Sequence, residues 1–200
     1  QKVFKSILLG KIDNTVGGIS GGQFARYDKD NQAYLLKGAL RMPSGKSDWF
    51  NSLLLKLDQE KLSSISVKRK KIIFEIESKD RKLSLKNNPD LKIDEEKLKQ
   101  VAEVIDAFYF YDVRKVNKIK KNNNNTISYE FKDGLILELK FIEKSKDSKE
   151  SWIEISAQSN NPKTINEAQD LNKKTKGYQF LANINTSVIF NWNIKDLIKK

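Results

Sequence analysis

Residues 127–141, which read ISYEFKDGLILELKF, carry the clearest signal of the fold. Apolar residues alternate with polar ones over 127–131, and they alternate again over 135–141. A period of two is that of a strand with one buried face. Asp133-Gly134 separates the two runs, and this dipeptide favours a tight hairpin turn because such a turn needs positive φ. The stretch therefore predicts two antiparallel strands.

The same alternation recurs on both sides of this hairpin. Each further run is short and is bounded by glycine, asparagine, aspartate or lysine, which are typical of turns. Short strands joined by short turns favour antiparallel pairing. The predicted strands cover residues 3–9, 24–27, 33–36, 65–67, 72–76, 83–85, 111–116, 152–155 and 177–184.

Helical periodicity is clearest over residues 94–109. Apolar residues recur there every three or four positions, and three carboxylates occupy the first turn, where they favour the positive end of the helix dipole. Two more helices are predicted over 47–57 and 186–198, each after a residue able to cap its start. Residues 160–176 are polar and are predicted to be mostly irregular.

These elements predict an α+β fold with one or more antiparallel sheets of short strands and about three helices. Groups of strands alternate with single helices, which suggests repeated strand–helix units. One division places a first lobe at 1–116, ending with the amphipathic helix and a strand, and a second lobe at 117–200, beginning with the Asp-Gly hairpin. The alternative is one continuous domain, which 200 residues also allow.

The sequence contains neither cysteine nor histidine. This excludes thiolate nucleophiles, disulfides, imidazole bases and the metal sites that depend on either side chain. An enzyme would have to use carboxylates, lysine or tyrosine, and a glycosidase needs two carboxyl groups about 5–9 Å apart. No spacing in the sequence places such a pair. We therefore expect a non-catalytic domain without catalytic, cofactor-binding or metal-binding residues.

The net charge is +12, and it has two interpretations. The first is an anionic partner such as an acidic polymer, a lipid surface or nucleic acid. The second is compositional, because 33 of the 38 basic residues are lysine and lysine codons are rich in A. The small number of arginines argues against a nucleic-acid partner, because proteins that recognise bases rely on the planar guanidinium group of arginine. The candidate binding surface consists of Lys68, Arg69, Lys70, Lys71, Lys118, Lys120 and Lys121.

Two other patterns invite a functional interpretation. Ser44-Gly45-Lys46-Ser47 is similar to the end of a phosphate-binding P-loop, but the glycine required five positions before Gly45 is replaced by leucine. A turn followed by a helix cap explains it better. The aromatic run over residues 108–111 is interpreted as core packing, with one ring left to contact a partner.

No run approaches the roughly 18 apolar residues that a membrane-spanning helix requires. No signal peptide is visible, and the chain opens with glutamine in what reads as a strand. We therefore expect the chain to be a segment of a longer protein.

The N-terminal part resembles a bacterial family known as domain of unknown function 4340. The resemblance covers residues 7–67 and is looser beyond them, with phenylalanine and alanine at 24 and 25 where the family shows tyrosine and valine. It rests on Leu9-Gly10, the glycine-rich loop over 17–22, Gln23-Phe24-Ala25-Arg26, Gln32-Ala33-Tyr34-Leu35-Leu36, Asp48-Trp49, Leu54, Gly177-Tyr178 and Asp196-Leu197.

This resemblance has implications for the cellular location and the binding partners of the protein. Family members are typically anchored by one N-terminal helix and face the periplasm, and they are often encoded beside ABC-transporter components of the gliding-motility auxiliary type. The expectation is a binding or scaffolding module on the periplasmic side of the inner membrane. It would act on a protein partner in the cell envelope and reach the membrane through an upstream anchor. No catalytic residue is carried over.

Overall fold

The computed structural model describes residues 6–16, 19, 21–40, 49–88, 91–116, 125–146 and 149–199. The chain divides into two compact units, Gln1–Gly45 and Lys46–Lys200. Within the described residues, no helix is both long and apolar enough to cross a membrane.

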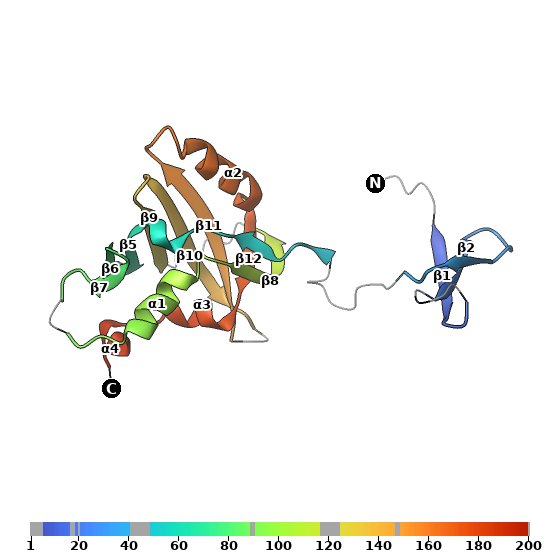
Figure 1. The fold of residues 1–200 in the computed structure, drawn as a ribbon, viewed down its shortest axis with the longest axis horizontal. Helices are drawn as coiled ribbons and strands as arrows, with labels where there is room; N and C mark the ends of the chain where they lie inside the picture. The colour runs from blue at the N-terminus through green and yellow to red at the C-terminus, as the bar shows by residue number, and fades with distance from the viewer. Residues whose placement is uncertain are drawn as a thin grey trace. The chain divides into compact units, whose positions relative to one another are not determined.

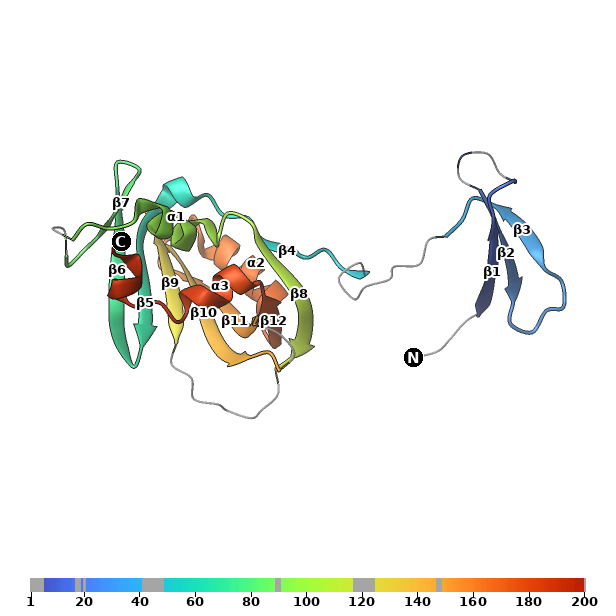
Figure 2. The ribbon, with the colours of Figure 1, turned by 90° about the horizontal axis from the view of Figure 1, so that it is seen from below.

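The first unit contains a three-stranded antiparallel sheet in the order β1-β2-β3 (Figure 2). Its strands are β1 (Ile7–Asp13), β2 (Gly22–Tyr27) and β3 (Tyr34–Lys37). The predicted hairpin over 24–36 is confirmed. The expectation that Gly10 ends the first strand is wrong, because β1 continues past it. A side chain at Gly10 would lie 3.2 Å from the Phe24 Cβ, a tight contact that favours glycine where β1 approaches β2.

The second unit contains one nine-stranded sheet in the order β4-β8-β12-β11-β10-β9-β5-β6-β7. Every neighbouring pair is antiparallel, which confirms the α+β prediction. The Asp-Gly hairpin joins β9 to β10, and Gly134 has φ +87°. The strands are β4 (Leu53–Leu55), β5 (Leu62–Arg69), β6 (Lys71–Lys79), β7 (Lys82–Leu85), β8 (Phe108–Lys115), β9 (Thr126–Phe131), β10 (Leu135–Lys144), β11 (Ser151–Ser159) and β12 (Tyr178–Ala182).

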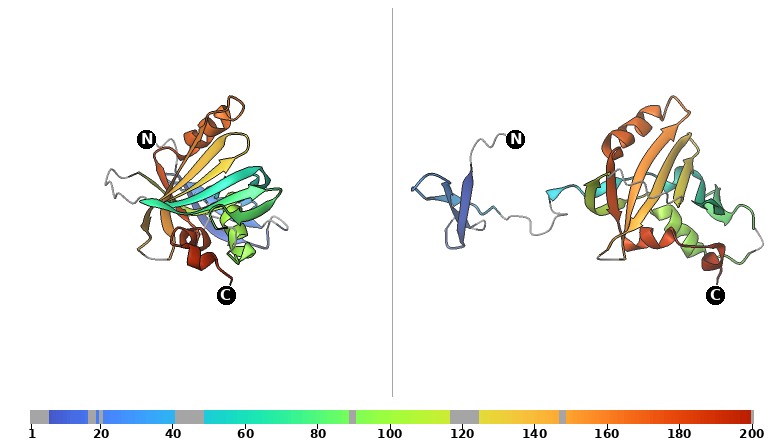
Figure 3. Two further views of the ribbon diagram at one scale, coloured as in Figure 1. Left: turned by 90° about the vertical axis from the view of Figure 1, so that its left-hand side faces the viewer. Right: turned by 180° about the vertical axis from the view of Figure 1, so that it is seen from behind.

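The described residues of this unit include four α-helices, whose arrangement is seen in Figures 1 and 3. They are α1 (Glu95–Glu103), α2 (Ile165–Thr175), α3 (Ile184–Ile189) and α4 (Ile194–Leu197), and a short 3₁₀ turn covers Gln59–Lys61. Helix α1 starts where the sequence predicts, because the Asp94 carboxylate accepts a hydrogen bond from the Glu96 N–H at 3.1 Å. Helix α2 packs along β11.

The order of elements is repeated. The run β5-β6-β7-α1-β8 is followed by β9-β10-β11-α2-β12, so three strands, a helix and a strand occur twice. The two runs share one sheet, because β5 pairs with β9 and β8 pairs with β12. The lobe boundary predicted at residue 116 thus falls within one continuous sheet, in which the second run forms the centre and the strands of the first run lie on both sides of it.

The core lies on one face of this sheet. Ile76, Ile65, Tyr129, Leu137 and Ala157 are direct partners in successive strands, and directly paired residues point to the same side. All five are buried. Helices α1 and α3 add their apolar residues to the same cluster.

Two of the predicted helical stretches differ in the structure. No helix forms over the described part of 47–57: β4 pairs with β8 there, and the Phe50 ring stacks on Phe110 with centroids 4.9 Å apart. Helix α1 ends at Glu103 instead of 109. The aromatic run that follows is β8, whose period of two buries Phe108 and Phe110.

The last third of the chain also differs from the prediction. Residues 160–176 contain α2, whose buried Ala168, Leu171 and Thr175 are spaced at helical intervals. Only two of these side chains are apolar, so the stripe was weak in the sequence. The single helix predicted over 186–198 is two short helices, α3 and α4, each with an asparagine N-cap.

Candidate binding groove

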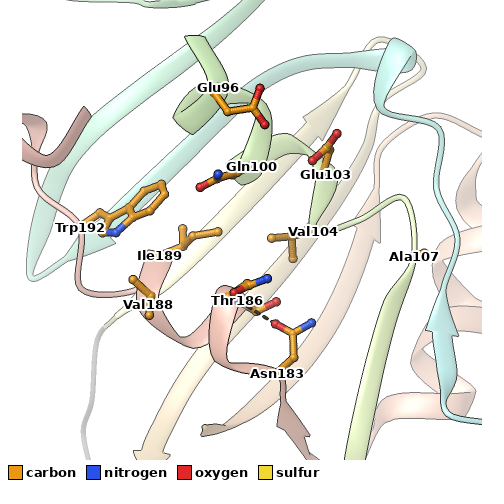
Figure 4. A pocket seen from close by; sticks show the side chains of 11 residues that line it. Glu96, Gln100, Glu103, Val104, Ala107, Asn183, Thr186, Val188, Ile189 and Trp192 are labelled. Carbon is orange, nitrogen blue, oxygen red and sulfur yellow. Dashed lines mark hydrogen bonds between the residues drawn. The ribbon is translucent and has the colours of Figure 1, made fainter. Parts of the chain in front are cut away.

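A groove of about 530 Å³ lies between α1 and the segment formed by α3 and the residues after it (Figure 4). Helix α1 supplies one wall, and α3 supplies the other. Its lining residues are Glu96, Gln100, Glu103, Val104, Ala107, Asn183, Asn185, Thr186, Val188, Ile189 and Trp192.

The α1 wall is polar because of its helical spacing. Glu96, Gln100 and Glu103 are separated by four and three positions, so they lie along one stripe of the helix. The buried stripe of α1 contains Leu98 and Val101 and faces the sheet. Glu96 and Gln100 are exposed, whereas Glu103 is half-buried and its carboxylate lies 3.4 Å from the Lys99 ammonium.

The α3 wall is fixed by hydrogen bonds at the start of the helix. The Asn183 side-chain oxygen accepts from the Thr186 N–H at 2.8 Å (Figure 4), and the Ser187 hydroxyl donates to the Asn183 carbonyl at 2.8 Å. Thr186 and Ser187 are buried. A short helix has little stability of its own, so these caps and its buried side chains hold it in place.

The floor of the groove is apolar and ends at an indole. Val104 and the exposed Val188 contribute aliphatic surface above the buried Ile189, and Trp192 follows from the turn after α3. The Trp192 carbonyl accepts from Arg69 at 2.7 Å, which anchors its backbone to the β5–β6 hairpin. The Lys97 ammonium lies 5.9 Å from the centre of the indole ring, within the range of a cation–π contact.

A third carboxyl group lies just beyond Glu103. Desolvation raises the pKa of Asp106, and the nearby charges of Glu103 and Asp58 add to this effect. The Gln59 N–H donates to Asp106 at 3.2 Å and acts in the opposite direction on its pKa. Asp106 itself is outside the groove lining, whose carboxylates are Glu96 and Glu103.

This arrangement can hold a surface that carries apolar and cationic groups. Its carboxylates are spread along a helix face rather than aimed at one point. In the described part of the chain, no three acidic side chains gather as a metal site requires. A partly open groove with an apolar floor and a polar rim is the form of site that receives a peptide segment.

The structure describes four of the seven residues predicted as a basic surface. Lys68 and Arg69 end β5, Lys71 begins β6, and Lys70 between them takes a positive φ of 25°. Lys70 and Lys71 are exposed. The other three, Lys118, Lys120 and Lys121, lie outside the described residues, as does the Ser44-Gly45-Lys46-Ser47 motif.

Arg69 has a structural role in this turn. Its guanidinium donates to the Phe190 carbonyl at 3.3 Å, to the Trp192 carbonyl at 2.7 Å and to the Asn193 side chain at 3.0 Å. These bonds use the planar fork that an anionic ligand would need. The groove itself was missed by sequence reasoning. Its only local signal was the polar stripe on α1, which is common to surface helices.

A protein-family model, described as domain of unknown function (DUF4340), matches residues 4–126. The chain belongs to the DUF4340 family. The match covers more than half of the chain and extends beyond the resemblance over residues 7–67. The DUF4340 match includes the α1 wall of the groove and stops before the α3 wall. No curated protein and no solved structure matches the chain.

Proposed function

We propose that this DUF4340 chain is a non-catalytic binding module of a membrane-associated complex in the bacterial cell envelope. The α1–α3 groove would receive a segment of a protein partner. The observation that carries the proposal is the contrast between the groove and the chain: its rim carries Glu96 and Glu103, whereas the whole chain has a net charge of +12.

The groove suits an amphipathic helix with a basic edge. Apolar side chains of such a helix would lie on Val104, Val188 and Trp192, as anchors do in helix-in-groove recognition. Lysine or arginine on its edge would face the carboxylates of α1. Charge of this kind adds specificity and speeds association more than it adds affinity, and salt screens it.

The cellular setting of the proposal comes from the family resemblance. Related proteins are typically anchored on the periplasmic side and encoded beside ABC-transporter components. We therefore propose an envelope protein, with a transporter subunit as the first candidate, as the source of the bound segment.

Site-specific photo-cross-linking in host cells tests this function. A photoreactive amino acid replaces Gln100, which is exposed on the groove wall, and a matched variant carries it at Lys173, which is exposed on α2. We expect position 100 to cross-link to one envelope protein and position 173 to give no such product. Identical products at both positions, or only cytoplasmic products, would contradict the proposal.

The exposed Lys70 and Lys71 favour a second candidate function, binding of an anionic polymer, lipid surface or nucleic acid. Such binding is driven by counterion release and weakens steeply as salt rises. The test is a titration of DNA, RNA and acidic vesicles at low and high salt, with Lys70→Ala and Lys71→Ala variants beside the parent chain. Absence of binding at low salt would eliminate this function.

A further inference from the structure

One face of the β1-β2-β3 sheet, called here the apolar face, is made of large apolar side chains. The strand register places them together, because Ile7 pairs with Tyr27, Leu9 with Ala25, Ala25 with Tyr34, and both Ile12 and Leu36 with Gln23. Directly paired residues point to the same side of a sheet. The apolar face therefore consists of Ile7, Leu9, Ile12, Gln23, Ala25, Tyr27, Tyr34 and Leu36.

The large residues of this face surround Ala25, which has a small side chain. The six large side chains are between 38% and 57% exposed, whereas Ala25 and Gln23 on the central strand are buried. A hollow of about 260 Å³ lies beside the small Ala25, and the large side chains around it are Ile7, Tyr27, Tyr34 and Leu36. A three-stranded sheet of this size has marginal stability by itself, so its exposed apolar face is expected to be buried against another surface.

The strand residues that form the apolar face carry no charge. The opposite face differs, because the register assigns Asp13, Arg26 and Lys37 to it. Arg26 also borders the hollow, but its guanidinium donates to the Asp30 carbonyl at 2.9 Å. On a chain of net charge +12, an uncharged face is where two copies can meet without repulsion.

We propose that the apolar face pairs with the apolar face of a second copy of this chain, forming a two-layer β-sandwich around a two-fold axis. A two-fold interface uses the same patch on both copies, so the patch must be compatible with itself. Uncharged aliphatic and tyrosine side chains meet this requirement. Their bulk on the outer strands can enter the hollow of the facing sheet, as side chains do between packed sheets.

The area of the face matches what a dimer needs. A large side chain offers ~150–200 Å² when free, so six of them at about half exposure give ~500 Å² per copy. Two copies then bury ~1,000 Å², which is the lower end of specific interfaces. The dimer is therefore expected to form reversibly at micromolar concentration and is independent of the α1–α3 groove.

Size-exclusion chromatography with light scattering, run over a range of protein concentrations, measures the molar mass and so tests the proposal. The test variants replace two adjacent residues of β3. Leu36 belongs to the apolar face and is 47% exposed, whereas Leu35 belongs to the opposite face and is 41% exposed. We expect the parent chain and Leu35→Asp to be dimeric and Leu36→Asp to be monomeric. Circular dichroism checks that both variants keep the folded sheet.

The absence of cysteine gives a second measurement that does not disrupt the face. Ala25→Cys places one thiol at the centre of the apolar face, close to the expected two-fold axis, and Leu8→Cys places one on the opposite face. Mild oxidation should link the first variant into dimers at least tenfold faster than the second. A parent chain that stays monomeric at 100 μM or more, or equal linking of both variants, would overturn the proposal. So would a monomer whose binding to phosphatidylglycerol vesicles is lost in Leu36→Asp, which would assign the face to a membrane.

Discussion

The hydroxyl of Tyr129 donates a hydrogen bond to the carbonyl of Val101 at 2.9 Å, and both residues are completely buried. Tyr129 lies on β9 and Val101 lies near the end of α1, so this bond ties the groove helix to the centre of the sheet. Carbonyls in the last turn of a helix lack partners within the helix. Burial also raises the pKa of Tyr129, which keeps its hydroxyl a donor.

Replacement of Tyr129 by phenylalanine removes this donor and leaves the Val101 carbonyl buried without it. We expect Tyr129→Phe to lower the free energy of unfolding by about 1–2 kcal/mol, the usual cost of a buried unsatisfied group. Urea unfolding measures the change. Tyr109→Phe is the matched control, because Tyr109 is 45% exposed on β8. Equal stability of the two variants would show that the hydroxyl does not support α1.

Arg69 is expected to matter for stability more than its lysine neighbours do. Arg69→Lys keeps the charge but cannot reproduce the fork that holds the Phe190 and Trp192 carbonyls, so we expect a loss of about 1–3 kcal/mol. Lys71→Ala, at an exposed position of the same hairpin, should leave the unfolding midpoint unchanged. An Arg69→Lys variant as stable as the parent chain would return this residue to the candidate basic surface.

Substitutions at Gly134 and Gly177 distinguish the stability cost of backbone strain from that of steric overlap. Both have positive φ, +87° and +86°, but a side chain at Gly134 would lie 3.0 Å from the Asn161 Cβ, whereas Gly177 has nothing within 4 Å. Gly177→Ala should cost about 1 kcal/mol for its left-handed backbone. Gly134→Ala should cost more, because Asn161 must move away from its 2.7 Å bond to the Asp133 carbonyl. Thermal unfolding of the pair measures the difference, and equal costs would contradict the steric contribution.

Asp106 should make the free energy of unfolding fall as pH rises through its folded-state pKa. Its pKa is raised in the folded state, mainly by burial, so the folded state binds the proton more tightly than the unfolded chain. Its stabilising contribution is fully present below pH 3.8, the ordinary pKa of an aspartate, and is lost as pH rises through the folded pKa. Asp106→Asn keeps an acceptor for the Gln59 N–H, so it should be more stable than the parent at neutral pH.

Unfolding at a series of pH values measures this effect. The advantage of Asp106→Asn should shrink as pH falls toward 3.8 and vanish below it. Asp170→Asn serves as the opposite case, because the hydrogen bond and charge of Lys173 lower the pKa of Asp170. It should give no gain at neutral pH. A parent chain more stable than Asp106→Asn at neutral pH would contradict the sign.

Prediction from the sequence succeeded where one short stretch contains all the necessary chemistry. The β9–β10 hairpin needed only alternating residues and Asp133-Gly134, and the start of α1 needed only Asp94 as its cap. Prediction failed where a segment takes its structure from partners that are distant in the sequence. Leu53 to Leu55 have good helix propensity, yet they form β4 because β8 offers a strand to pair with and a buried place for Leu55.

The candidate groove shows the same division. Glu96, Gln100 and Glu103 could be placed on one stripe of a helix from their spacing. Their facing wall depends on Asn183 and Trp192, about 80 residues later, and on Arg69, which holds the Trp192 carbonyl from a third element. No local pattern specifies which helix faces which.

The sequence alone specified the antiparallel strands, the hairpin turns and the amphipathic helix α1, because hydrophobic period, turn chemistry and capping act between residues a few positions apart. It also excluded thiol and imidazole chemistry, since it contains neither side chain. Three features depend on the folded chain instead: β5 pairs with β9, α1 faces α3, and the turn between α3 and α4 holds Arg69. These outcomes depend on burying apolar surface and satisfying backbone groups among residues that lie far apart in the chain.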